Sequence, residues 1–147
     1  MKYQVEVIID RPRNEVIQLF DSTEHMHQWM EGLLEFEHLS GTPGEVGAKS
    51  KMRFQMGKRD MTLIETITTR NLPDELSGTY EAPGAFNIVN NYFEALNEHQ
   101  TRYMVVQEFK FDSFGMKLLS ALLPGMFKKQ SLKNMNAFKA YAERTNL

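Results

Sequence analysis

The sequence predicts an α+β domain in which one curved antiparallel sheet packs around a long C-terminal helix. Residues 33–111 alternate between apolar and polar side chains for much of their length, which is typical of strands with one buried face. Apolar residues in 114–144 instead recur at the three- and four-residue spacing of a helix. A chain of 147 residues fits one domain, so we expect residues 1–147 to form a single domain.

The N-terminal segment is expected to form one strand and two short helices. Residues 3–10 alternate as a half-buried strand does, and Pro12 suits the first turn of a helix, where its missing N–H is no loss. An apolar helix face follows at i, i+3 and i+4, made by Val16, Leu19 and Phe20. A second helix is predicted to begin at Ser22 or Thr23, because both are good caps.

About six antiparallel strands are predicted between residues 33 and 111. In the first, Leu34, Phe36 and His38 share one side. Residues 41–47 come next and are expected to form a loop, because they are rich in glycine and contain a proline. The clearest strand follows, with its apolar side made by Met52, Phe54 and Met56. The connections between these segments are short, which indicates antiparallel neighbours.

The C-terminal helix is expected to cover the apolar face of the sheet. Its first half is predicted to face the core through Leu118, Leu119, Leu122 and Leu123. Pro124 should kink or split the helix, because it removes one backbone hydrogen bond and clashes one turn back. A long curved sheet cannot close tightly on one helix, so we expect a cavity that binds a hydrophobic small molecule.

Composition argues against several other classes of function. The net charge is −2 and no basic stripe is visible, so nucleic acid is not an expected partner. Cysteine is absent, which excludes thiol nucleophiles and thiolate metal sites. No apolar run approaches the ~18 residues of a membrane span, and the N-terminus lacks the apolar core of a signal peptide. We therefore expect a cytoplasmic monomer or weak homodimer, without stable membrane insertion.

The sequence suggests no metal or cofactor. His25 and His27 are close in sequence but diverge on a helix, so they would not bind one ion together. The glycines of 41–47 lack the Lys-Ser/Thr ending of a phosphate-binding loop. The 10 methionines and 10 phenylalanines suit an irregular ligand cavity, although they could equally fill a core.

Glu65 is the leading candidate for a polar group in the cavity. It shares strand parity with Met61, Leu63 and Ile67, so it faces the cavity if they do. A buried carboxyl there would have a raised pKa and could bind a ligand or act as a general acid or base. The alternatives are a strand of opposite parity, or a glutamate that is paired at the cavity opening.

Further candidate ligand-binding residues lie on other predicted strands and on the C-terminal helix. Gln107 interrupts an apolar face, where it could orient a ligand or bond to a neighbouring strand. Tyr80 and Tyr103 could add hydroxyl groups. The apolar lining is predicted to comprise Met52, Phe54, Met56, Phe109, Phe111, Met116 and Phe127. The polar end of the ligand would be bound by Glu65, Tyr103 and Gln107.

Several motifs resemble the START-like superfamily, also called SRPBCC or the polyketide cyclase/dehydrase and lipid transport proteins. The matching stretches are Val7–Pro12, Glu15-Val16, Leu19-Phe20, Trp29–Leu33, Gly44–Gly47, Glu65–Ile67 and Leu72-Pro73. The resemblance spans essentially the whole chain and implies a helix-grip fold around a deep hydrophobic cavity. It implies binding or transport of a lipid or polyketide-like molecule, and no catalytic residue can be transferred from the family's enzymes.

Two alternative functions remain open at this point. The resemblance also includes cyclases and dehydratases that need no cofactor, in which case Glu65 would act as the base and Tyr80 or Tyr103 as the proton donor. The chain could instead be a protein-interaction module that uses a sheet edge or the C-terminal helix. Since relatives collect lipids from bilayers, residues 116–126 could also touch a membrane, although their helical spacing favours a place in the core.

Overall fold

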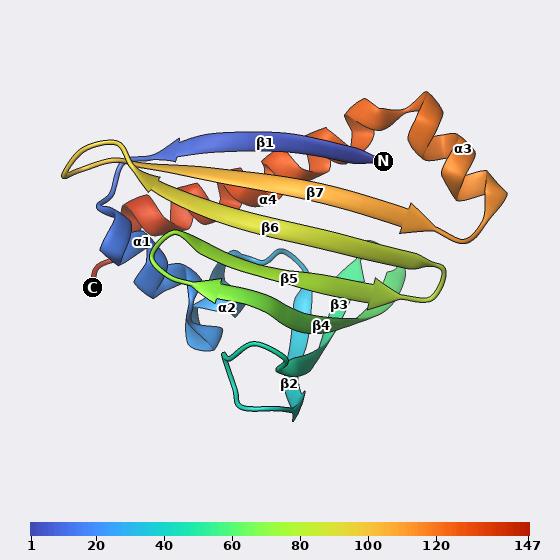
Figure 1. Cartoon of the computed structure of the whole chain (residues 1–147), viewed down its shortest axis with the longest axis horizontal. Helices are drawn as coiled ribbons and strands as arrows, with labels where there is room; N and C mark the ends of the chain where they lie inside the picture. Colours follow the sequence, from blue (N-terminus) through green and yellow to red (C-terminus); the bar gives the residue numbers. More distant parts are fainter.

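A computed structural model of residues 1–147 shows an α+β fold with a seven-stranded antiparallel sheet and four helices (Figure 1). The strands are β1 (Lys2–Ile9), β2 (Leu33–Ser40), β3 (Lys49–Met56), β4 (Arg59–Asn71), β5 (Glu75–Ala82), β6 (Ala85–Ala95) and β7 (Thr101–Phe111). The helices are α1 (Arg13–Phe20), α2 (Thr23–Trp29), α3 (Phe114–Leu122) and α4 (Pro124–Arg144). The predicted order of elements is confirmed, with the C-terminal helix split at Pro124.

The strands follow the order β1-β7-β6-β5-β4-β3-β2, so the N-terminal strand pairs with the last one. The long strands β4, β6 and β7 curve across the molecule, and α4 lies along the β1 side of the sheet (Figure 1). Helices α1 and α2 lie at one end of the sheet, whereas α3 lies at the opposite end. None of the helices has the length and apolarity needed to cross a bilayer.

The main core lies where α1 and α4 pack on β1, β6 and β7. Phe138 of α4 and Phe93 of β6 are almost completely buried there, and Phe20 of α1 packs edge-on against both rings. A smaller buried cluster lies towards the β2 edge of the sheet and contains Met26, Leu33 and Met52. The two clusters are separate, so the sheet and the helices do not form one continuous packed interior.

The prediction for the first residues of β2 was wrong. Leu34 is 47% exposed, whereas its neighbour Leu33 is buried. The register of β2 against β3 shifts between Leu33 and Glu35. An irregularity of this kind turns a side chain from one face of a strand to the other, and a strict period of two cannot anticipate it.

The prediction that the first half of the C-terminal helix faces the core was also wrong. Leu118, Leu122 and Leu123 are exposed, and Leu119 is only partly buried. The buried side chain of α3 is Ser120. Because the helix breaks at Pro124, α3 leaves the line of α4 and lies at the end of β7 (Figure 1), where its apolar side chains are left exposed. Helical spacing shows that residues share a face but not which surface that face meets.

Candidate functional site

Two adjoining cavities lie between the sheet and the helices. The polar cavity has a volume of about 880 Å³ and is lined by residues of α2, β2, β4 and β5, with loop residues beside them. The apolar cavity has a volume of about 400 Å³, and 15 of its 21 lining residues are hydrophobic. The two cavities share Phe20, Trp29, Met30, Tyr80 and Asn91, which lie where they meet.

Most of the side chains predicted to bind a ligand line these two cavities. Those in the apolar cavity are Met52, Phe54, Met56, Tyr103, Gln107, Phe109 and Phe111, while Glu65 lines the polar cavity. Phe127 lines neither cavity. Its ring packs against Phe109, which does line the apolar cavity, with 5.3 Å between the ring centroids. Met116 lies on α3, away from both cavities, because α3 does not cover the sheet.

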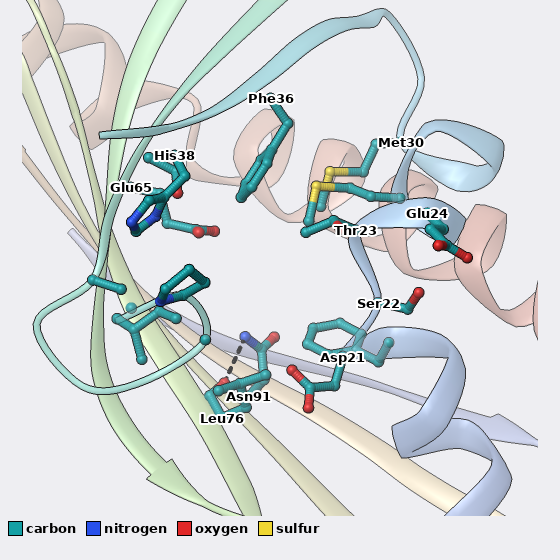
Figure 2. Close-up of a pocket in the computed structure, with 18 of the residues that line it drawn as sticks. Asp21, Ser22, Thr23, Glu24, Met30, Phe36, His38, Glu65, Leu76 and Asn91 are labelled. Atoms are coloured by element: carbon teal, nitrogen blue, oxygen red, sulfur yellow. Dashed lines mark hydrogen bonds between the residues drawn. The ribbon is translucent and has the colours of Figure 1, made fainter. Parts of the chain in front are cut away.

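One face of β4 runs along both cavities. Met61 and Leu63 line the apolar cavity, and Glu65 and Ile67 line the polar one. The strand parity that the alternation indicated is therefore present, and it brings Glu65 to the interior face. Figure 2 shows the Glu65 carboxylate pointing into the polar cavity, close to His38.

A row of polar side chains crosses the sheet at the level of Glu65. His38 on β2 is the register partner of Ser50 on β3, and Ser50 is the partner of Glu65 on β4. The row continues through Tyr80 on β5 to Asn87 on β6. Cross-strand partners lie about 5 Å apart, so neighbouring members of the row are close enough to contact the same ligand.

Glu65 and Tyr80 form the central pair of this row. The Tyr80 hydroxyl donates a hydrogen bond of 2.9 Å to Oε2 of Glu65. Burial raises the pKa of the Glu65 carboxyl, and the hydrogen bond from Tyr80 opposes part of that rise. Burial, together with the neighbouring carboxylate charge, raises the pKa of Tyr80 well above its ordinary value. Tyr80 therefore remains a hydrogen-bond donor at neutral pH, and Glu65 keeps its proton to a higher pH than an exposed carboxyl does.

The hydroxyl of Tyr103 has a different hydrogen-bond acceptor from that of Tyr80. It donates to Oδ1 of Asn91 over 2.9 Å, and the Asn91 amide in turn donates to the carbonyl of Leu76 over 3.0 Å. The Tyr103 ring stacks on Phe93 with 5.1 Å between centroids, and burial raises the pKa of its phenol. Tyr103 thus contributes mainly its ring face to the apolar cavity, since its hydroxyl already has an acceptor.

Gln107 connects the sheet to α4. Its amide oxygen accepts from Asn87 at 3.3 Å, and its amide nitrogen donates to the Ser131 hydroxyl at 2.7 Å. Ser131 also bonds to the Tyr3 hydroxyl at 2.6 Å. Both ends of the Gln107 amide therefore have protein partners, although the side chain also lines the apolar cavity.

The helices contribute cavity residues that sequence reasoning did not select. Trp29 and Met30, from the end of α2, lie at the junction of the two cavities, and the Trp29 ring packs edge-on against Phe138 at 4.8 Å. Around the polar cavity, ionisable side chains are supplied by Asp21, Glu24, His27 and His38. The alternation that marks a strand face could have found His38, but the approach of α2 to the sheet has no local signal.

The two histidines of α2 lie in different surroundings. His25 hydrogen-bonds to the Tyr141 hydroxyl of α4, whereas His27 lines the polar cavity. No three or more of the His, Asp and Glu side chains are grouped closely enough to hold a metal ion.

This chain resembles known proteins in its three-dimensional structure. No family model matches the sequence, and none of the curated proteins does. The Zhui aromatase/cyclase of Streptomyces sp. R1128 superposes with a TM-score of 0.80 at 13% identity, over 98% of this chain and 94% of that one. Ara h 8.0201 superposes with a TM-score of 0.74 at 14% identity, over 97% of each chain.

A third solved structure extends the comparison to an enzyme with bound ligands. Norcoclaurine synthase from Thalictrum flavum, in complex with dopamine and hydroxybenzaldehyde, superposes with a TM-score of 0.74 at 11% identity. The match covers 100% of this chain and 89% of that one. Likeness at such low identity reports architecture and not activity. The sheet order, the long α4 and these superpositions together show that the chain shares the helix-grip fold of these three proteins, which is the fold that the START-like resemblance implied.

Proposed function

We propose that this protein binds an apolar small molecule that carries a neutral hydrogen-bonding group at one end. The observation that carries the proposal is the position of the Glu65–Tyr80 pair beside the apolar cavity. The ligand body would lie against Met52, Phe54 and Phe109, and its polar end would reach the pair. Pockets with a mostly apolar lining and a few convergent polar groups are typical of small-molecule sites.

The apolar lining would supply most of the affinity. Removing about 200 Å² of apolar ligand surface from water is worth about 5 kcal/mol, before the cost of fixing the ligand in place. The polar pair would select the ligand's end group. A protonated Glu65 can donate to a carbonyl, and an ionised Glu65 can accept from a hydroxyl, but it repels a carboxylate. We therefore expect ketones, phenols and alcohols rather than fatty acids.

Displacement of a fluorescent apolar probe tests the proposal. We expect 1-N-phenylnaphthylamine to bind the purified protein and to be displaced by bicyclic phenols. Val89 lines the apolar cavity, so Val89→Phe should fill part of it and weaken probe binding about tenfold. Val46→Phe is the matched control, because Val46 is exposed on the loop before β3.

Two results would contradict this function. One is a wild-type protein that binds neither the probe nor any apolar compound detectable by native mass spectrometry. The other is equal probe affinity in Val89→Phe and the wild type, when circular dichroism shows that the variant is folded. That result would put the probe outside the cavity.

Acid–base catalysis of the cyclase or dehydratase type is a second candidate function. The specific observation in its favour is a carboxyl of raised pKa that is hydrogen-bonded to Tyr80 and faces a cavity. Glu65 would remove a proton from the carbon next to a ligand carbonyl, and Tyr80 would stabilise the enolate oxygen by donating its proton or a hydrogen bond. Tyr103 is the alternative donor, although its hydroxyl already bonds to Asn91.

Proton exchange on a simple ketone separates the two functions. With 2-tetralone in D₂O, a catalyst should exchange the protons at C1 and C3 faster than buffer does, as followed by NMR. Glu65→Gln should abolish the enhancement while tetralone still displaces the fluorescent probe. Exchange at the buffer rate in the wild type, with tetralone bound, would leave the binding function and refute this form of catalysis.

A further inference from the structure

Helix α3 and the first turn of α4 expose several large apolar side chains. Phe114 is 80% exposed and Leu122 is 69% exposed. We call this set the α3 patch, and it comprises Phe114, Met116, Leu118, Leu122, Leu123 and Met126. Within α3, the residues at i, i+4 and i+8 form one stripe along the helix, namely Phe114, Leu118 and Leu122. Soluble proteins rarely expose such a grouping unless it contacts another surface.

The segment that carries the patch is strongly basic, although the whole chain has a net charge of −2. Between Ser113 and Ala142 the sequence contains five lysines and no aspartate or glutamate. Two of the lysines are neutralised within the fold, since Lys133 pairs with Glu31 at 3.3 Å and Lys139 with Glu143 at 2.5 Å. The other three, Lys117, Lys128 and Lys129, have no carboxylate partner and lie in α3 or just after Met126.

We propose that α3 and the first turn of α4 bind the surface of an anionic lipid bilayer. Phe114, Leu118 and Leu122 would enter the boundary between headgroups and acyl chains, and the unpaired lysines would contact lipid phosphates. An exposed apolar stripe beside lysines is the pattern by which helices bind in the plane of a membrane surface. Attachment is peripheral, because no helix is long and apolar enough to span the bilayer.

The shape and charge of the patch favour a bilayer over other occupants. Helix α3 lies at one end of the sheet, apart from α1 and α2 (Figure 1), and its apolar side chains are exposed, which leaves them free to enter a bilayer. A second copy bound through the same patch would bring Lys117, Lys128 and Lys129 towards their own equivalents, and like charges repel. A nucleic acid would satisfy the lysines but would leave Leu118 and Leu122 without apolar partners.

The patch also lies near one end of the apolar cavity. Phe111, at the end of β7, lines that cavity, and the chain passes from it directly into α3. A bilayer bound at α3 would therefore lie beside this end of the cavity. The membrane proposal itself does not depend on what the cavity binds, since the patch and its lysines lie outside both cavities.

Co-sedimentation of the full chain with lipid vesicles tests the proposal. We expect binding to vesicles of phosphatidylcholine mixed with phosphatidylglycerol, and weak binding to phosphatidylcholine alone. High NaCl should release the protein, because the Debye length falls to about 3 Å at 1 M salt. The double variant Lys128→Gln/Lys129→Gln should lower the partition coefficient about 30-fold. The matched control is Lys49→Gln/Lys58→Gln, which removes the same charge from β3 and the turn after it, four strands away from β7 in the sheet order, and should have a much smaller effect.

The apolar contribution is tested by Leu122→Asp, with Val46→Asp as the control at another exposed apolar site. We expect at least tenfold weaker vesicle binding for Leu122→Asp only, at unchanged thermal stability. Insertion has its own signal. After subtraction of the wild-type spectrum, which reports Trp29, the emission of Phe114→Trp should shift to shorter wavelength on anionic vesicles, whereas that of Val46→Trp should not.

Three outcomes would overturn the proposal. The first is a folded wild-type protein that sediments with neither kind of vesicle. The second is a homodimer that Leu122→Asp dissociates, because the patch would then be a subunit interface. The third is unshifted emission of Phe114→Trp on vesicles that bind the protein, which would show that the contact is electrostatic and made elsewhere. Probe binding in the apolar cavity is measured separately, so the membrane proposal can fail while the proposed ligand function stands.

Discussion

Glu65 and Tyr80 are direct register partners on β4 and β5, and their side chains are joined by a hydrogen bond of 2.9 Å. The sheet backbone therefore holds the pair, and neither side chain needs a long flexible reach to meet the other. A donor and a buried carboxyl that are positioned in this way before binding cost little entropy when a ligand arrives. The pair is consequently the part of the cavity where changes of charge and of hydrogen bonding give the clearest predictions.

Glu65→Gln should remove a pH dependence from the stability of the protein. Below the ordinary carboxyl pKa of 4.5, Glu65 is protonated in both the folded and the unfolded chain. Between that value and the raised folded pKa, only the unfolded chain releases its proton, so rising pH favours unfolding by up to about 1.4 kcal/mol per pH unit. The destabilisation is complete above the folded pKa.

Urea unfolding of the wild type and Glu65→Gln from pH 4 to pH 8 measures this effect. The unfolding free energy of Glu65→Gln minus that of the wild type should increase with pH and then level off. Other titrating groups contribute equally to both proteins, so their contributions cancel in this difference. The glutamine carbonyl can still accept from Tyr80, so the hydrogen bond is retained. Parallel stability curves across this range would show that the Glu65 pKa is not raised in the folded protein.

Tyr80→Phe should leave the Glu65 carboxyl without its donor. We expect a loss of about 1–2 kcal/mol of unfolding free energy at neutral pH, because a buried acceptor loses its hydrogen bond. The pKa of Glu65 should rise further, since the bond from Tyr80 opposes its increase. NMR titration of the Glu65 side-chain carboxyl carbon measures the second effect. Tyr92→Phe, on the neighbouring strand β6, is the control and should leave that titration unchanged.

The bond between Tyr3 and Ser131 should contribute to the attachment of α4 to the sheet. Ser131 bonds to both Tyr3 and Gln107, so Ser131→Ala removes partners from two strands at once. We expect Ser131→Ala to cost about 1–3 kcal/mol and Tyr3→Phe about 1 kcal/mol. A double-mutant cycle should give a coupling energy of about 1 kcal/mol for this pair. Additive losses would mean that the hydroxyl groups act independently.

Much of the sheet could be predicted from local patterns. The alternation through Met52 and Phe54 on β3 identified the face that lines the apolar cavity, and the same rule on β4 placed Glu65 on the interior face. Pro124 marked the break between α3 and α4, because a proline has no backbone N–H to donate. These features depend on the chain within a few residues, which is the range that a sequence pattern reports.

The remaining features depend on elements that are distant in sequence. The sequence left open whether Gln107 orients a ligand or bonds to a neighbouring strand, and its bond to Asn87 on β6 is of the second kind. Its other partner, Ser131, comes from a helix whose placement on the sheet has no local signal. The polar cavity needs α2 to lie over β2 and β5, and only the folded arrangement brings His27 and His38 to one space. The exposure of Leu122 likewise depends on how α3 is oriented relative to the sheet, and the break at Pro124 does not determine that orientation.

The contrast between the two parts of the C-terminal helix can be measured by truncating one apolar side chain in each. Phe138 of α4 is fully buried among Phe20, Trp29 and Tyr103, so Phe138→Ala should destabilise the protein by about 3–5 kcal/mol. Leu122 of α3 is largely exposed, and Leu122→Ala should change the stability by no more than about 0.5 kcal/mol.

Chemical denaturation of both variants checks this contrast, and Phe138→Leu provides a milder change if Phe138→Ala does not fold. Phe138→Leu keeps most of the apolar volume and should cost about 1–2 kcal/mol. A loss of several kcal/mol for Leu122→Ala would mean that α3 packs against the sheet in solution. In that case the α3 patch would belong to the core, as its helical spacing first indicated, and no apolar surface would be left there to bind a membrane.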